Sequence, residues 1–146
     1  MLNKKRIAIL LGDPSGIGPE IVSKLLCEKI IDNANILVIG ERKILEEGEN
    51  ISGKKGNFKF VNNSKDIVFD DETKFFLDIS KGTNRTYKYG QVSAESGASV
   101  LEAMDEAMDL ANNKKIDAVN FGPMNKSSLI MGGCPYNDEH DYFQKK

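Results

Sequence analysis

Hydrophobic positions along the chain follow two patterns: short continuous apolar runs and longer stretches of helical spacing. The run RIAILL, from Arg6 to Leu11, is rich in branched residues and is followed by a glycine, which is typical of a strand buried on both faces. Pro19 then stands where the first turn of a helix tolerates proline. Apolar residues recur at helical spacing after it: Ile21, Val22, Leu25, Leu26 and Ile30. The opening is therefore predicted to be a strand, a glycine turn and a helix.

The alternation of strand and helix continues through the middle of the chain. The run NILVIG, Asn35 to Gly40, predicts a second strand, and ERKILEE predicts a short helix that ends before Gly48. The polar, glycine-rich residues 50–57 predict a loop. FKFVNN and KFFLDIS are two further strand candidates, and Gly82 to Tyr89 is predicted to be a surface loop.

The last third of the chain carries the clearest helical pattern. Ser93 to Lys114 is predicted to be a helix with one apolar face: Val100, Leu101, Met104, Ala107, Met108 and Ala111. A strand at Ala118 to Phe121 and a helix from about Asn125 to Met131 follow. Alternating elements predict an α/β fold with three layers, α/β/α, and a largely parallel sheet. The strands at 6–11 and 118–121 should be neighbours, with Gly12 and Gly122 at one edge.

Composition narrows the class of partner. The chain has 146 residues, the size of one domain, with 40% hydrophobic and 29% charged residues, a net charge of -2 and no apolar run long enough for a membrane span. Positive and negative residues are interspersed along the sequence, so the charge pattern does not indicate a basic patch for nucleic acid or for an anionic membrane surface. Small molecules are therefore the expected partners. The two cysteines, Cys27 and Cys134, do not form a pattern spaced for disulfide bonds or metal binding, which favours a reducing, cytoplasmic setting. With His140 as the only histidine, a His-rich metal site within this chain is excluded.

The turn GDPSGIGPEI, Gly12 to Ile21, is the first candidate for chemistry. Ligands of open α/β sheets bind beyond the carboxyl ends of strands, where this turn is expected. Its glycine spacing is neither GxGxxG nor GxxxxGK[ST], which weakens the hypothesis of a nucleotide-phosphate enzyme. A tight packing turn and a loop that lines a ligand both remain open.

Three segments in order resemble one known family. GDPSGIGPEI resembles the opening motif of the 4-hydroxythreonine-4-phosphate dehydrogenase family of pyridoxine biosynthesis, and its GIGPE core is similar to a turn of isocitrate and isopropylmalate dehydrogenases. YGQVSAESG, Tyr89 to Gly97, resembles the family's entry to a long helix. FGPMNKSSLIMGG, Phe121 to Gly133, resembles its G-P-x-N-K segment. The resemblance implies one lobe of the isocitrate/isopropylmalate dehydrogenase-like fold.

The resemblance also implies an activity. Members have two lobes around a cleft, use NAD or NADP with a divalent metal (Zn, Mg or Co), and form homodimers. They oxidise a β-hydroxy acid such as 4-phosphohydroxy-threonine or a related compound, and the β-keto acid can then lose carbon dioxide. Their three metal-binding histidines lie downstream of the matched segments, so residues 1–146 are expected to be the N-terminal portion of a two-lobed dehydrogenase, without the second lobe and inactive alone. The cofactor-binding residues are unknown.

Lys126, Asn125 and Asp13 are the candidate site residues in the matched segments. Lys126 follows a strand and opens a helix, so it can meet an anionic substrate and is the candidate catalytic residue. Asn125 and Asp13 are candidates for substrate binding. A solvated lysine at a helix start is the alternative for Lys126, and a helix N-cap is the alternative for Asn125.

The segment PYNDEHDYF, Pro135 to Phe143, departs from the family pattern. In an ungapped match, Glu139 and His140 fall on a His-Thr pair that contacts substrate in the family. We assign both to substrate binding, although a carboxylate there repels phosphate, by roughly 4 kcal/mol for unit charges about 4 Å apart at an effective dielectric constant of 20. The substrate then lacks a phosphate group next to Glu139, or a cation bridges the phosphate and the Glu139 carboxylate. A solvated acidic turn with His140 on its surface is the alternative.

A function from another class competes with the dehydrogenase. The chain could be a non-catalytic relative that binds small molecules or serves as a scaffold, keeping the lobe without the chemistry. Further sequence carrying spaced histidines would favour the enzyme.

Overall fold

A five-stranded sheet forms the centre of the molecule. The computed structural model describes residues 4–70 and 72–146. Within them the strand order is β3-β4-β2-β1-β5, and every adjacent pair is parallel. The strands are β1 Lys5–Leu10, β2 Ala34–Gly40, β3 Lys59–Val61, β4 Phe75–Asp78 and β5 Ala118–Phe121. The predicted parallel sheet is confirmed.

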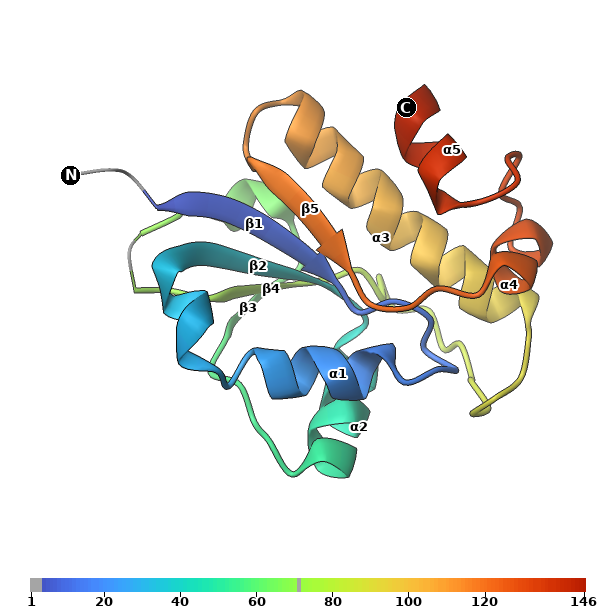
Figure 1. Cartoon of the computed structure of the whole chain (residues 1–146), viewed down its shortest axis with the longest axis horizontal. Helices are drawn as coiled ribbons and strands as arrows, with labels where there is room; N and C mark the ends of the chain where they lie inside the picture. Colours follow the sequence, from blue (N-terminus) through green and yellow to red (C-terminus); the bar gives the residue numbers. More distant parts are fainter. Residues whose placement is uncertain (1–3, 71) are drawn as a thin grey trace.

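Helices cover both faces of the sheet, which confirms the three layers (Figure 1). The residues from Ala8 to Leu11 alternate between two cores because successive side chains point to opposite faces. Ala8 and Leu10 pack towards α3 (Ala94–Asn112), and Ile9 and Leu11 pack towards α1 (Gly18–Leu25) and α2 (Arg42–Ser52). The helices are α1 Gly18–Leu25, α2 Arg42–Ser52, α3 Ala94–Asn112, α4 Lys126–Met131 and α5 Glu139–Lys145, with short 3-10 helices at Lys29–Asn33 and Ser64–Asp66. Among the described residues no helix has the length and apolar character to cross a membrane.

Neighbouring β1 and β5 bring two glycine turns together, as predicted. Their register runs from Ile7 opposite Ala118 to Leu10 opposite Phe121. Gly12 has φ +82°, and a Cβ there would lie 2.5 Å from the carbonyl oxygen of Pro123. Only glycine combines that backbone angle with that approach. The first turn is therefore locked against the second.

Two predicted helix ends were wrong. The helix predicted to end before Gly48 continues to Ser52, because a Cβ at Gly48 would lie 2.5 Å from the backbone of Pro19 and its absence lets α2 cross α1 closely. The helix predicted to run to Ile30 ends at Leu25. The chain there passes through an extended Glu28 into a 3-10 helix.

The end of the chain contains a helix that the hydrophobic pattern did not predict. Asp138 caps it by accepting a hydrogen bond from the backbone N–H of Asp141 at 3.0 Å. Tyr142 is buried, and its hydroxyl donates to Asp105 of α3 at 2.6 Å. The acidic segment is thus the first turn of α5, docked on α3.

Candidate functional site

The carboxyl ends of β1, β2 and β5 meet at one edge of the sheet, where open α/β folds bind ligands. Gly12, Glu41 and Gly122 are at or just past these ends. A cavity of about 10 Å³, room for about one water molecule, lies there and is lined in part by Gly12, Pro14, Glu41 and Ser99. This cavity is therefore too small for a ligand larger than water. A larger pocket of about 270 Å³ lies beside the glycine turn and is lined in part by Ser15, Gly16 and Tyr89.

Asp13 lies beneath this edge and is buried. Its Oδ1 accepts the backbone N–H of Ser15 at 2.7 Å and the hydroxyl of Ser96. The Ser15 and Ser96 hydroxyl oxygens are themselves 3.2 Å apart. These contacts fasten the glycine turn to the first turn of α3, whose N-cap is Ser93. The observed contacts of Asp13 are thus internal.

Asn125 and Lys126 begin α4 directly after the second glycine turn. Asn125 is the N-cap, and its Oδ1 accepts the backbone N–H of Ser128 at 2.9 Å. The Lys126 side chain is 60% exposed, and its Nζ lies 3.3 Å from Oδ2 of Asp138. The capping alternative for Asn125 is confirmed. Lys126 is on the surface but carries an ion pair that joins α4 to α5.

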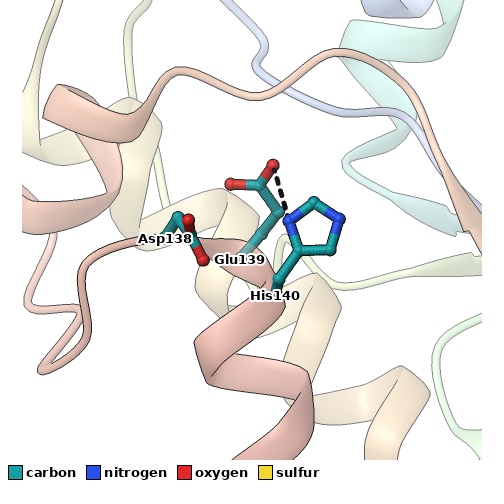
Figure 2. A group of neighbouring side chains, drawn as sticks. All are labelled: Asp138, Glu139 and His140. Atoms are coloured by element: carbon teal, nitrogen blue, oxygen red, sulfur yellow. Dashed lines mark ion pairs between the residues drawn. The ribbon is translucent and has the colours of Figure 1, made fainter.

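Glu139 and His140 lie side by side at the start of α5. Figure 2 shows the Glu139 carboxylate beside the His140 ring, with Asp138 on the other side of Glu139. Glu139 Oε1 is 3.7 Å from His140 Nδ1. The Glu139 side chain is 14% exposed, its Oε2 is buried without a hydrogen-bond partner among the described residues, and the His140 side chain is 79% exposed. Glu139 thus turns inward while His140 faces solvent.

Asp138, Glu139 and His140 are the described residues whose donor atoms come close enough to share a cation, within 4.8 Å of one another. Asp138 is already committed, because one oxygen accepts from the backbone of Asp141 and the other faces the ammonium of Lys126. A cation would compete with that ammonium, and the set has a single imidazole. These residues therefore do not fit the resident metal that the resemblance implies.

The five predicted site residues fall into two groups. Asn125, Lys126, Glu139 and His140 lie at the starts of α4 and α5, which the Lys126–Asp138 ion pair joins. In residues 4–70 and 72–146, no hydrogen bond or ion pair links Asp13 to any of these. Their convergence on one ligand stays a prediction.

The sequence reading missed a buried cluster around Glu41. Glu41 Oε1 accepts from Arg85 at 3.1 Å, from Ser99 at 2.9 Å and from the Tyr87 hydroxyl. Its Oε2 is buried without a hydrogen-bond partner among the described residues, 3.6 Å from the Lys43 ammonium. Residues 83–92, which we call the crossing segment, are thereby pinned to the end of β2. The position of Glu41 at the end of an apolar strand was the signal that could have found it.

The cluster shifts the pKa values of two of its members, Tyr87 and Arg85. Burial raises the pKa of Tyr87, and the hydrogen bond to Glu41 raises it further. Burial lowers the pKa of Arg85, but hydrogen bonds to Glu102 and Glu41 outweigh that and raise it overall. The predicted surface loop is thus confirmed as a loop, but one held by buried charges. Its Gly90 N–H donates to the Ser15 carbonyl at 2.8 Å, so it closes one side of the glycine turn.

Comparisons with known proteins agree with this architecture. The family model described as pyridoxal phosphate biosynthetic protein PdxA matches residues 32–146. A Pasteurella multocida relative, named as a 4-hydroxythreonine-4-phosphate dehydrogenase, is 32% identical over 99% of this chain and 44% of its own. A Fusobacterium nucleatum relative, named as a D-threonate 4-phosphate dehydrogenase, is 33% identical over 91% of this chain and 40% of its own.

Solved structures show the same fold. A 4-hydroxythreonine-4-phosphate dehydrogenase from Burkholderia phymatum superposes with a TM-score of 0.83 at 29% identity, covering 97% of this chain and 43% of that one. The enzyme of the same name from Klebsiella pneumoniae gives 0.81 at 26% identity, with 97% and 44% covered. The chain thus spans less than half the length of the relatives it matches.

Proposed function

The chain belongs to the PdxA family of pyridoxal phosphate biosynthetic proteins, and from this premise we propose that it is the N-terminal part of a dehydrogenase that oxidises, and then decarboxylates, a β-hydroxy acid. The family match over residues 32–146 carries the proposal. The relatives' names, 4-hydroxythreonine-4-phosphate and D-threonate 4-phosphate dehydrogenase, support a substrate among small phosphorylated hydroxy acids or related compounds.

The complete enzyme takes NAD or NADP, a divalent metal such as Zn, Mg or Co, and a second copy of itself. A bound divalent metal would supply Lewis-acid stabilisation of developing negative charge, and a bound nicotinamide cofactor would supply hydride-transfer chemistry. The ligands of the metal come from sequence outside these 146 residues, which form one wall of a cleft whose other wall is a second lobe. The two free cysteines, Cys27 and Cys134, suit a cytoplasmic setting.

Within this lobe we assign roles at the carboxyl edge. Lys126 meets the anionic group of the substrate with its exposed ammonium. Asn125 contributes its amide NH₂, since its Oδ1 is engaged by the helix cap. Glu139 and His140 line the other side of the bound substrate, and Asp13 supports it through the glycine turn that it fastens.

The test is a family-length protein in which residues 1–146 are joined to the second part of the Pasteurella multocida relative. With NAD or NADP, a divalent metal and 4-hydroxythreonine 4-phosphate, we expect steady formation of reduced cofactor. Lys126→Ala should lower kcat/KM by about tenfold or more, as the loss of a hydrogen bond to a charged group does. Lys115→Ala, an exposed lysine before β5 at the opposite edge, is the matched control and should leave kcat/KM unchanged.

The same assay separates the alternative of a non-catalytic binding or scaffolding relative. If the joined protein folds and binds the substrate but forms no reduced cofactor with either nucleotide, the dehydrogenase proposal is wrong. Equal kcat/KM for Lys126→Ala and the starting protein would show that Lys126 does not act on the substrate and is a solvated lysine at the start of a helix.

A further inference from the structure

Asp138 holds the ammonium of Lys126 from a fixed position. Its Oδ1 accepts the backbone N–H of Asp141 at 3.0 Å as the N-cap of α5, and its Oδ2 lies 3.3 Å from Lys126 Nζ. The cap fixes the carboxylate while the lysine side chain, 60% exposed, is free to change rotamer. The pair is thus a fixed anion and a movable cation.

A second carboxylate stands next to this pair. A Glu139 oxygen is within 4.8 Å of a carboxylate oxygen of Asp138. The Glu139 side chain is mostly buried, and its Oε2 has no hydrogen-bond partner among the described residues. A ligand anion that takes the Lys126 ammonium therefore meets the Asp138 carboxylate, which the cap holds in place, with the Glu139 carboxyl group beside it. The repulsion between the ligand and Asp138 grows with the charge of the ligand.

We propose that Asp138 is a specificity-determining residue that occupies Lys126 in the free protein and disfavours dianionic phosphate relative to singly charged carboxylate at this point. The inference rests on the proposed role of Lys126 in meeting the substrate's anion. The lysine then receives the carboxylate end of the hydroxy acid, and any phosphate group lies away from the Asp138–Glu139 pair.

The ionisation of Asp138 supports this assignment. The hydrogen bond from the backbone of Asp141, followed by that from Lys126, lowers the pKa of the Asp138 carboxyl. The carboxylate is therefore charged at neutral pH and competes with ligand anions throughout the range in which phosphate is dianionic.

The test compares the binding of inorganic phosphate and of acetate to the 146-residue chain at pH 8 and constant ionic strength, by NMR titration of the backbone amide of Lys126. Asp138→Asn keeps the cap, because asparagine is an equally good N-cap residue, and removes the charge. We expect phosphate to bind about two- to fivefold more tightly to this variant, the range of an exposed ion pair, and acetate to gain less.

Three further variants complete the design. Asp141→Asn removes a neighbouring charge that makes no ion pair with Lys126 in the described chain, and it should leave the phosphate affinity unchanged. Lys126→Gln should weaken phosphate binding, and Asp138→Asn combined with Lys126→Gln should show no gain.

Equal phosphate affinity for Asp138→Asn and the starting chain would overturn the inference, as would an equal gain for acetate or a gain that persists without Lys126. If Asp138→Asn has no effect while Lys126→Gln weakens binding, Lys126 keeps its proposed role and only the inference about Asp138 is wrong. If Lys126→Gln has no effect either, the proposed role of Lys126 is wrong as well.

Discussion

Two charged clusters beside the carboxyl edge differ in burial and in the number of their partners. Glu41 is fully buried and receives hydrogen bonds from Arg85, Tyr87 and Ser99. Lys126 is 60% exposed and has one ion-pair partner within residues 4–70 and 72–146, Asp138, at 3.3 Å. A buried charge that loses a partner cannot turn to water, whereas an exposed one can exchange its partner at little cost. The Glu41 cluster therefore holds the edge together, and this contrast is why we propose that a ligand enters at the Lys126 pair.

The largest effect is expected from breaking the Glu41 cluster. Glu41→Ala leaves Arg85, whose side chain is 14% exposed, with Glu102 as its remaining carboxylate, and should lower the free energy of unfolding by about 3 kcal/mol. Urea denaturation followed by circular dichroism measures it. Glu47→Ala, in the helix that Glu41 precedes and against Tyr89 of the same crossing segment, is the control and should change stability by less than about 0.5 kcal/mol. Equal losses for the two variants would show that the buried Glu41 cluster stabilises the fold no more than the exposed Glu47 contact does.

A smaller effect separates the cap from the ion pair at Asp138. Asp138→Ala removes the N-cap of α5 and should cost about 1 kcal/mol of unfolding free energy. Asp138→Asn keeps the cap and should cost only a few tenths, because the lost pair with Lys126 is exposed. A similar large loss for both variants in urea denaturation would show that the ion pair itself stabilises the fold.

The smallest effect concerns the opposite edge of the sheet, where Arg6 and Asp117 form an exposed pair. Hydrogen bonds from the side chain and backbone of Arg6 lower the pKa of Asp117 to about 2, against roughly 3.9 in an unfolded chain. A lowered folded pKa adds stability above about pH 4 that is lost as the pH falls towards 2. Asp117→Asn should therefore flatten the acid limb of the stability curve between pH 4 and 2, measured by urea denaturation. An unchanged acid limb would mean that the pair contributes nothing.

The sequence predicted the elements whose signal is local and strong. The strands β1, β2 and β5, the helix α3 and the cap at Asn125 are all confirmed, because the apolar runs of β1 and β2, the helical spacing in α3 and helix capping follow from a few neighbouring residues. The start of α4 was found for the same reason.

The features that the sequence did not predict depend on contacts between segments that are far apart along the chain. The extension of α2 through Gly48 follows from its approach to Pro19, which no local pattern reveals. Glu41 and Arg85 are 44 positions apart, and their pairing appears only when the crossing segment folds over the end of β2. The ion pair of Lys126 with Asp138 likewise needs α5, whose burial comes from Tyr142 against α3.

We propose above all that substrate binds at the carboxyl edge of this lobe, with Lys126 at the entrance. The most direct measurement is an NMR titration of the 146-residue chain with 4-hydroxythreonine 4-phosphate, which maps the backbone amides that shift. The account predicts shifts grouped at residues 12–18, 122–126 and 138–140, and their loss in Lys126→Ala. Shifts confined to the opposite edge, around Arg6 and Asp117, or a map unchanged in Lys126→Ala, would contradict it.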